Sequence, residues 1–546
     1  MCFTMTAKES QTQTSEVALS KMVKHRGLIF LLVVQALVVV SCETSVPLST
    51  LVHKAPGSDK TLRYDVSAPL ASLNPLDHGN SGGTFVFPLL YSYLVVPNAQ
   101  GSLEPDLASK WSYDPEKFIW TVHLREGVLF HDNTPVTSRD VKYSFQAVLE
   151  KIHPFQFSLT EKISLLSDTA LRIALKRDEP DFLYKIRDME VVPQSREGKT
   201  GGYHHPVGSG PFRFEYTKGD REVGLLANED YFRGRPSLDR VVFYFQPNKE
   251  KTWTRLLTGR TDVAREISPK NYKMIKGHDE QYYFHVYPLE WYTILLYNGT
   301  HPLFSDPQVR QALTHAIDRQ HMVDEILEGC GVVAAGAMGV NSPFHNPEVK
   351  PIPYRPKKGL RLLQEAGWSW DKAGRHLVKD GQGFEFTVLV FEESQIEKKV
   401  AQYIRLCLNE LGIKVHVQCL PHSELMRRYV GNDEYEAVLT ELGGAYCDPG
   451  FLESLWCPSG AKRAAGCLEN AELSRLMGHA MRENDGEKKR GLLHEIDAMI
   501  ASLQPGTFLF HKTAIDVMSK RLTLASPFSL TRDGGWRLKD ATLNED

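Results

Sequence analysis

Residues 397–418, EKKVAQYIRLCLNELGIKVHVQ, contain a helix, a turn and a strand in direct succession, and this pattern defines the fold class. A helix is predicted over 397–411 because apolar residues recur at helical spacing on its inward face: Ala401, Ile404, Leu408 and Leu411. Gly412 then supplies the left-handed residue that ends a helix. The strand that follows alternates polar residues with apolar ones, namely Ile413, Val415 and Val417. Helical and strand patterns alternate along the whole chain, which predicts an α/β protein built from helix-flanked sheets.

Other segments carry the same signals. A helix is predicted over 305–327, because Ser305 or Asp306 can cap it and Pro307 suits its first turn. Two further helices are predicted, at 84–96 and 140–150, and a strand is predicted at 119–124. Strands are also predicted at 290–297 and 508–510, where the chain would cross between two halves of the fold.

The N-terminal region has the features of an export signal. Basic residues within 21–26 precede an apolar run at 28–40, and the small-residue segment VVSC ends at Cys42. This arrangement is similar to a bacterial lipoprotein box, in which the cysteine thiol receives lipid. The apolar run is shorter than the roughly 20 residues of a spanning helix; the alternatives are a plain signal peptide or an uncleaved anchor. Residues 1–41 are therefore predicted to be a signal peptide, with Met22 as the expected true start because the first 20 residues are polar.

The composition narrows the class of protein. The chain carries 64 basic and 67 acidic side chains, and removal of residues 1–41 leaves 505 residues with a formal charge of −5. This mild acidic balance, without a basic block, makes nucleic acid and anionic membrane surfaces poor candidate partners. Six cysteines follow Cys42, and none forms Cys-x-x-Cys, so neither a zinc ribbon nor a redox dithiol is expected. The length predicts two or three domains.

Seven short segments match, in order, the sequence patterns of one family. They begin with LEPDLASKW at 103–111 and WTVHLREGVLFHD at 120–132, and the last is LLQEAGW at 362–368. The other four are 206–212, 228–234, 257–264 and 309–319. Together they resemble family 5 extracellular solute-binding proteins, which include the oligopeptide-, dipeptide- and nickel-binding receptors of ABC importers. Asn133 replaces a glycine of the family pattern, and asparagine tolerates a left-handed turn better than other non-glycine residues.

This resemblance implies a two-lobed fold of the periplasmic-binding-protein type II, with three subdomains. The lobes of such receptors close on the ligand, and the closed form is the one that the permease recognises. The expected parts are the lipid-anchored linker 42–57, lobe I at 58–100, 196–288 and 506–546, a small domain inserted in lobe I at 101–195, and lobe II at 289–505.

Candidate ligand contacts follow from position in the family pattern. For each aromatic residue among them, packing in the core is the alternative. They are Asn80, Ser81, Gly82 and Thr84 after the first strand of lobe I; Trp291, Tyr292 and Tyr297 on the crossing strand; Phe391, Glu392 and Glu393 after a strand of lobe II; Gly443, Gly444, Ala445, Tyr446 and Asp448 on a lobe II loop; and Phe510 and His511 on the return crossing.

The loop at 443–449, GGAYCDP, bears on the ligand class. Peptide-binding relatives hold the amino terminus of the ligand with an aspartate on lobe II, and the matching position here is Ala445. A buried ammonium group needs a paired anion, so either a nearby carboxylate such as Asp448 or Glu441 replaces that aspartate, or the ligand has no free amine there. The loop is also similar to that of nickel-binding members. We therefore predict a peptide or peptide-like solute, with a chelated metal such as nickel as the alternative.

Further motifs were weighed against this interpretation. Ser459 and Lys462 match the S-x-x-K motif of penicillin-recognising hydrolases, but no S-D-N motif accompanies it. The adjacent His204 and His205 would point apart on a strand, so a metal site is not expected there. Cys457 and Cys467 enclose nine residues, similar to a small disulfide loop in the dipeptide receptor.

The sequence therefore predicts a monomeric receptor that is not an enzyme and holds no cofactor. Its expected partners are the solute, the permease of an ABC importer, and the membrane through the N-terminal lipid. It is expected to be exported and lipid-anchored to the bacterial cell envelope, at the periplasmic face or at the cell surface.

Cys42→Ala is expected to abolish lipidation, because Cys42 is the cysteine that follows the apolar run and the small-residue site. Metabolic labelling with palmitate, followed by membrane fractionation, measures this. Cys2→Ala is the matched control and should keep the label. A palmitate label that persists in the Cys42→Ala protein would contradict the prediction.

Overall fold

The structure of the protein is a computed structural model. The residues it describes are 60–75, 83–97, 103–150, 154–179, 182–196, 205–246, 248–277, 280–342, 344–431, 434–443, 452, 455–456, 470–483, 486–523 and 542–543. A membrane-spanning segment is not found among the helices of this described part.

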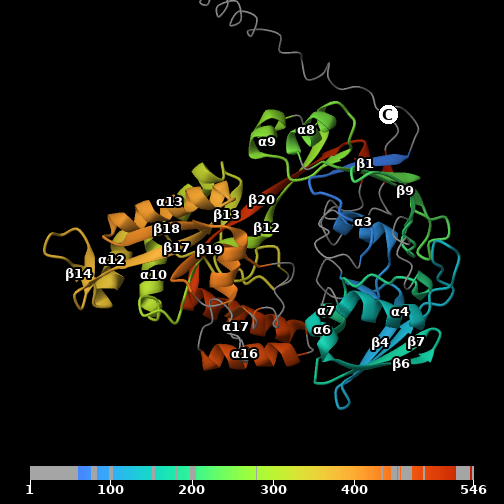
Figure 1. Cartoon of the computed structure of the whole chain (residues 1–546), viewed down its shortest axis with the longest axis horizontal. Coiled ribbons are helices and arrows are strands. Elements are labelled where there is room, and N and C mark those ends of the chain that lie inside the picture. The colour runs from blue at the N-terminus through green and yellow to red at the C-terminus, as the bar shows by residue number, and fades with distance from the viewer. Residues whose placement is uncertain are drawn as a thin grey trace, which may run out of the picture. The chain divides into compact units, whose positions relative to one another are not determined.

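A large mixed sheet runs through the fold (Figure 1). Its strands lie in the order β18-β17-β19-β12-β20-β11-β1-β10-β9-β8, and β13 also pairs with β20. Their bounds are β1 Thr61–Val66, β8 Phe212–Lys218, β9 Glu222–Ala227, β10 Arg240–Phe245, β11 Val263–Ala264, β12 Tyr282–Tyr297, β13 Gly331–Val333, β17 Glu385–Phe391, β18 Lys414–Leu420, β19 Ala437–Leu442 and β20 Gly506–Ser519. The group β17, β18 and β19 is parallel, as is the group β1, β10 and β11.

The two long strands β12 and β20 join these parallel groups. Residues 282–288 of β12 pair with 513–519 of β20, and β11 pairs with this same part of β20. Residues 292–296 of β12 pair with 506–511 of β20, and β19 pairs with 292–297 of β12 to continue the sheet. The register shifts between Pro288 and Tyr292. We call the part of the sheet on the β11 side the lobe I sheet and the part on the β19 side the lobe II sheet.

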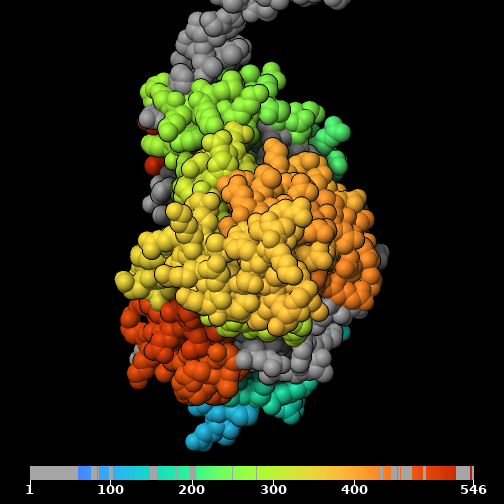
Figure 2. All heavy atoms as spheres, turned by 90° about the vertical axis from the view of Figure 1, so that its left-hand side faces the viewer, coloured from blue at the N-terminus to red at the C-terminus, as the bar shows by residue number. Residues whose placement is uncertain are grey.

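Helices cover both faces of the lobe II sheet. On one face the buried side chains of β12 and β17 pack against α10 Pro307–Ala316, α12 Pro356–Glu365 and α13 Gln395–Glu410. On the other face they pack against α16 Ala471–Arg482 and α17 Gly486–Leu503. Figure 2 shows the yellow and orange residues of lobe II toward the viewer, with the red-orange helices α16 and α17 beside them. Because helices cover both faces, successive residues of the central strands are apolar, as in Ile294, Leu295 and Leu296 of β12.

The helix-turn-strand prediction at 397–418 is confirmed. Ser394 caps α13 by accepting a hydrogen bond from the backbone N–H of Glu397 at 3.2 Å. Gly412 has φ +77°, and β18 follows directly. Two shorter helical segments also flank this sheet: α14 His422–Met426 and the π-helical turn η4 Arg427–Gly431.

The helix predicted at 305–327 is interrupted. The structure divides it into α10, α11 Arg319–His321 and the π-helical turn η3 Met322–Ile326. Ile317 is extended, and Asp318 begins the next turn by accepting a hydrogen bond from the backbone N–H of His321. The sequence did not predict this break, because the apolar spacing continues through it. A capping aspartate such as Asp318 cannot be told from a solvent-exposed helical residue by its place in the pattern.

Two arginines of this region are buried without a carboxylate partner among the described residues. Arg310 Nε donates to the carbonyl oxygen of Gln504, and its Nη2 donates to the carbonyl oxygen of Leu503, both at 2.8 Å. Arg319 donates to the carbonyl oxygen of Phe508 at 2.7 Å. Burial lowers the pKa of Arg319 to about 10. The two side chains therefore fasten the last residues before β20, and the strand itself, to the lobe II helices.

A second, four-stranded sheet lies between β1 and β8 in the chain. Its strands are β4 Ala108–Asp114, β5 Ile119–Leu124, β6 Thr160–Ser167 and β7 Ala170–Leu175, in the order β4-β5-β7-β6. The predicted strand at 119–124 is confirmed. The helix predicted at 140–150 is formed by α4 Ser138–Ser144 and the π-helical turn η1 Phe145–Leu149. Asn133 has φ +64°, as its place in the turn predicted.

The helix predicted at 84–96 is only half right. It corresponds to α3 Gly83–Leu90, whereas β2 Val95–Pro97 forms a short ladder with β3 Leu103–Pro105. The β-branched pair at 95–96 favours this extended conformation. The other short elements are α6 Pro154–Leu159, α7 Phe182–Lys185, η2 Gln194–Arg196, α8 Lys249–Leu257, α9 Pro269–Ile275, β14 Ser369–Trp370, β15 Leu377–Lys379, β16 Gln382–Gly383, β21 Leu522–Thr523 and β22 Thr542–Leu543.

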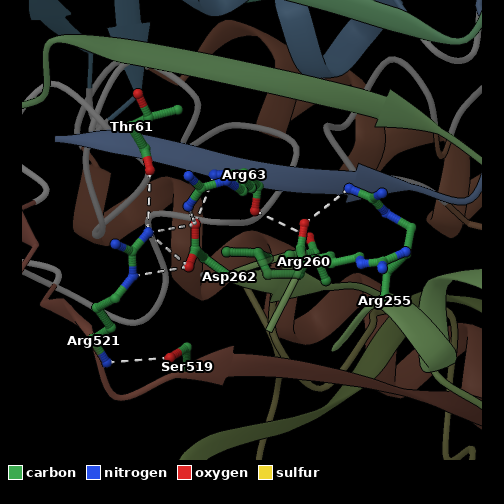
Figure 3. A network of polar contacts seen from close by, with 9 residues as sticks. Thr61, Arg63, Arg255, Arg260, Asp262, Ser519 and Arg521 are labelled. Atoms are coloured by element: carbon green, nitrogen blue, oxygen red, sulfur yellow. Dashed lines mark hydrogen bonds and ion pairs between the residues drawn. The ribbon is translucent and has the colours of Figure 1, made fainter. Parts of the chain in front are cut away.

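A buried aspartate fixes the end of β20 to the lobe I sheet (Figure 3). The Asp262 carboxylate accepts two hydrogen bonds from the Arg521 guanidinium, both at 3.1 Å, and one from the backbone N–H of Arg63 at 2.8 Å. Arg521 also donates to the carbonyl oxygen of Thr61 at 3.2 Å. The backbone N–H of Ser519 donates to the Asp262 carbonyl. Residues distant in sequence are thus joined on β1, beside β11 and at the end of β20.

Asp262→Ala is expected to destabilise the protein by about 3–5 kcal/mol, because it leaves the largely buried Arg521 guanidinium without its charge partner. Thermal unfolding measures the effect. Asp220→Ala is the matched control, because that side chain is 80% exposed and its contact with Arg221 is 3.9 Å long. A loss for Asp262→Ala no larger than that of the control would contradict the role assigned to this aspartate.

Candidate functional site

The carboxyl ends of β17 and β19 lie at one edge of the lobe II sheet, next to the register shift of β12 and β20. The sequence places Phe391 at the end of β17 and Leu442 at the end of β19, and Tyr292 pairs with both Leu442 and His511. In open α/β sheets, ligands bind outside the carboxyl ends of the parallel strands. This edge is therefore the candidate binding site.

Among the aromatic residues that were predicted for the site and that the structure describes, Trp291 is the one with a large exposed surface. It is 48% exposed and lies inside the register shift of β12. Tyr292 is buried, with its ring centroid 5.4 Å from that of Phe508 and 5.7 Å from that of His511. An exposed indole at a strand irregularity can stack on a solute without losing core packing.

Tyr297 and Phe510 lie in the hydrophobic core of lobe II and have no exposed surface. Tyr297 stacks on Phe304, with the ring centroids 4.8 Å apart, and its hydroxyl shares a 2.8 Å hydrogen bond with Thr507 Oγ1. This packing favours the core role that the sequence left open for both residues. The alternation of side chains along β12 turns Tyr297 toward the face that α10, α12 and α13 cover.

His511 is buried beside Trp291 and Tyr292. Its Nδ1 lies 3.0 Å from the carbonyl oxygen of Leu289. Burial lowers the pKa of His511, against the opposing effect of hydrogen bonds to the backbone of Leu289 and Trp291. The ring is therefore neutral at physiological pH, and the Nδ1–H donates to Leu289.

A loop of lobe II packs against this same point of β12. A Cβ on Gly339 would lie 3.3 Å from the carbonyl oxygen of Glu290, so the loop approaches the strand closely. Asn341 Nδ2 donates to the carbonyl oxygen of Pro288 at 2.7 Å. Asp497 on α17 holds the loop from the other side, because its Oδ1 accepts from the backbone N–H groups of Ala337 at 3.0 Å and Met338 at 3.2 Å.

Gly443 ends β19 with φ +108°, a conformation that L side chains rarely adopt. A Cβ at this position would lie 2.9 Å from the carbonyl oxygen of Glu290. The glycine therefore lets the chain leave the sheet directly beside the register shift, where the predicted ligand loop begins.

Charged side chains surround the site edge. The Lys512 ammonium forms an ion pair with the Glu441 carboxylate, and both side chains are about one-third exposed. Lys512 lies opposite the register shift, where β12 offers it no paired residue, and its backbone pairs instead with Gly331 of β13. Glu392 and Glu393 are exposed immediately after β17. The charged side chains named here, all within the part of the chain that the structure describes, are thus three carboxylates and one lysine.

A polar network that the sequence analysis missed lies at the matching edge of the lobe I sheet. Arg265 follows β11, and its Nε donates to Asp516 Oδ2 at 3.0 Å while its Nη2 donates to the Tyr287 hydroxyl at 2.7 Å. Tyr287 in turn donates to Asp516 Oδ2 at 3.1 Å. The Arg265 guanidinium carbon is 5.2 Å from the Phe85 ring centroid. The sequence signal that could have indicated this network is Arg265, a charged residue directly after the buried strand β11.

Several predicted site residues lie outside the described residues and stay predictions. They are Asn80, Ser81, Gly82, Gly444, Ala445, Tyr446, Asp448, Cys42, Cys457 and Cys467. Thr84 falls in α3, but its side chain is outside the description. Cys330, Cys407 and Cys419 are free thiols.

Comparison of this chain with models of known protein families identifies the class of protein to which it belongs. The model of bacterial extracellular solute-binding proteins, family 5 (middle region), matches residues 102–463. The chain belongs to this family. The predicted family membership and the α/β fold of the two-lobed binding-protein type are thereby confirmed, and the family consists of substrate-binding proteins of ABC importers.

Relatives of this solute-binding protein differ in what they bind. The oligopeptide-binding protein AppA of Bacillus subtilis is 26% identical over 458 residues, which cover 80% of this chain and 83% of that protein. The nickel-binding periplasmic protein of Escherichia coli is 24% identical over 465 residues, covering 82% and 88%. The solved structure of NikA from Brucella suis in complex with Fe(III)-EDTA is 23% identical and covers 89% of this chain and 100% of its own, with a TM-score of 0.76.

The loop held by Asp497 should make the stability of the solute-binding protein depend on pH. Burial raises the pKa of Asp497 from 3.8 to about 6, against the opposing backbone hydrogen bonds from Met338 and Ala337. A raised pKa in the folded state favours the protonated form, so this contribution is complete below about pH 4 and is lost as the pH rises through 6. The Asp497→Asn variant cannot lose it.

The stability of wild type relative to Asp497→Asn is therefore expected to fall by about 1–3 kcal/mol between pH 4.5 and pH 7.5. Thermal unfolding of both proteins at the two pH values measures the change. Asp220→Asn, at an exposed position, is the control and should follow wild type at both values. A constant difference between wild type and Asp497→Asn would show that burial does not perturb this carboxyl group.

Proposed function

We propose that this solute-binding protein captures a peptide or peptide-like solute at the carboxyl edge of the lobe II sheet and delivers it to the permease of an ABC importer. The observation that carries the proposal is Trp291, a half-exposed indole placed at the register shift of β12, next to the ends of β17 and β19. An aromatic platform beside exposed strand ends suits a solute with a peptide backbone. The oligopeptide-binding relative from Bacillus subtilis supports this solute class.

The protein acts as a receptor, and catalysis is not part of the proposed function. The family of substrate-binding proteins supports this role. We further propose that the protein is exported and held at the membrane by a lipid on Cys42, as a monomer. The N-terminal basic, apolar and small-residue pattern supports the anchor.

A chelated metal is the second candidate solute. The nickel-binding relative and the structural neighbour with bound Fe(III)-EDTA favour it, as does the loop sequence GGAYCDP at 443–449. In this case the chelating groups would contact the same edge, so the two candidates differ in solute and share a site.

The full chain, solubilised in detergent, is expected to bind at least one of dialanine, trialanine and penta-alanine in isothermal titration calorimetry. Trp291→Ala is expected to weaken this binding by about 1–3 kcal/mol, because it removes the exposed aromatic platform. The matched control is Trp370→Ala, which removes another partly exposed indole, 37% exposed, from β14 in a separate small sheet.

Two outcomes would decide against the peptide. Binding of a nickel–histidine chelate, with no binding of the alanine peptides, would establish the metal candidate. Equal losses of affinity in Trp291→Ala and Trp370→Ala would remove Trp291 from the site.

A further inference from the structure

Glu397 is a buried acidic residue at the start of α13. It lies in the first turn of that helix, where Ser394 caps the backbone. Glu397 is buried, with 9% of its surface exposed. Its Oε2 atom has no hydrogen-bond partner among the described residues. A buried carboxylate oxygen without a donor is costly, because water no longer solvates it.

The groups that act on Glu397 come from three strands. Glu441 on β19 and Lys512 on β20 exert charge effects on it, and the backbone of Phe391 at the end of β17 forms a hydrogen bond. These strands and α13 lie together in Figure 1. The Lys512 ammonium is already paired with Glu441. Glu397 therefore shares a single cation with a second carboxylate.

Further charged residues lie near this triad in the sequence. Glu392 and Glu393 are exposed on the turn that leads from β17 into α13, and Lys398 and Lys399 follow on α13 itself. These four side chains are not among the groups that act on Glu397. Among the described groups that do act on it, the two carboxylates of Glu397 and Glu441 share the one ammonium group of Lys512.

The protonation of Glu397 reflects the same imbalance. Burial and the neighbouring Glu441 raise its pKa from 4.5 to about 7, although Lys512 acts in the opposite direction. A helix N-terminus normally favours the ionised form of a carboxylate. Burial and the second carboxylate therefore outweigh the helix, and near neutral pH a proton takes the place of the missing cation.

We infer that Glu397, together with the Glu441–Lys512 pair, forms a subsite that exchanges a proton for a cationic group of the solute. The group is an ammonium or guanidinium, which donates to Glu397 Oε2. The Glu397 carboxylic acid loses its proton to solvent as the cation arrives, so charge is conserved at the subsite. Glu441 and Lys512 are about one-third exposed and open the subsite to solvent. The inference rests on the proposed capture of a solute at this edge.

The test compares free peptides with their N-acetylated counterparts, which lack the terminal ammonium group. The probes are dialanine, trialanine and penta-alanine, titrated into the full chain in detergent by calorimetry. Wild type is expected to prefer the free peptides at least tenfold at pH 8. Their affinity is expected to fall about tenfold from pH 8 to pH 6, because Glu397 must then be deprotonated before it binds the cation. Titrations at pH 7 in phosphate and in Tris should show proton release.

Glu397→Gln is expected to remove both the preference and the proton release. Glu410→Gln is the matched control: it removes the same charge at the exposed opposite end of α13 and should behave as wild type. Glu441→Gln is a second variant for the event that Glu397→Gln does not fold. Its position is partly exposed, and it should reduce the preference for free peptides.

The outcomes separate this inference from the proposed function. If wild type binds free and acetylated peptides equally, or if the preference survives in both Glu397→Gln and Glu441→Gln, the cation subsite is wrong and the peptide receptor stands. If no peptide of either kind binds, the proposed peptide function fails, and the inference that rests on it fails with it.

Discussion

The pairing of β12 with β20 is the interaction on which the rest of the structure depends. Each strand has one part in the lobe I sheet and another in the lobe II sheet, so a single antiparallel ladder connects the two groups of parallel strands. The register of this ladder shifts between Pro288 and Tyr292, around Trp291, and again between Thr293 and Ile294. A register shift leaves residues unpaired and re-aims their side chains. Here it exposes Trp291 and leaves the backbone of Lys512 without a partner on β12.

Polar networks secure β20 at successive points along its length. Near its beginning, Arg310 and Arg319 bind carbonyl oxygens from Leu503 to Phe508. Beyond its end, Arg521 binds Asp262. Between them, Lys512 pairs with Glu441 and Asp516 pairs with Arg265. The charged groups nearest the register shift are therefore held by the same strand that connects the two sheets.

This arrangement has a consequence for binding. Lys512 and Asp516 are four residues apart on β20: Lys512 lies at the shift, Asp516 lies in the lobe I sheet, and each belongs to a different polar cluster. A solute that changes the charge balance around Lys512 acts directly on the connecting strand. Receptors of this type respond to ligand by a shift between conformations, which requires that the ligand binds one of them better. A charge partner on the connecting strand is a physical means of producing that difference.

The sequence by itself determined the fold class, the family and most of the regular elements. The helix at 397–411, its glycine stop and the strand at 119–124 were predictable because periodicity and turn chemistry are local properties. The sequence also identified the neighbourhood of the site, since Trp291, Glu392 and Glu393 follow from their places beside strands. It did not distinguish Trp291 from Tyr297, because both are aromatic residues on one strand, and only the register shift of β12 leaves Trp291 exposed while Tyr297 packs in the core.

The tertiary structure alone decided the roles of the charged residues. Nothing local marks Glu397 as buried, since it lies in an ordinary amphipathic helix among lysines, and its environment arises from β17, β19 and β20. Arg265 and Asp516 are 251 residues apart, and Asp262 and Arg521 are 259 residues apart. Arg310 and Arg319 lie in a segment predicted to be helical, and carbonyl oxygens near β20 accept their hydrogen bonds in the interior. Electrostatic partnership depends on distance in space, and in this fold the ladder of β12 and β20 sets those distances.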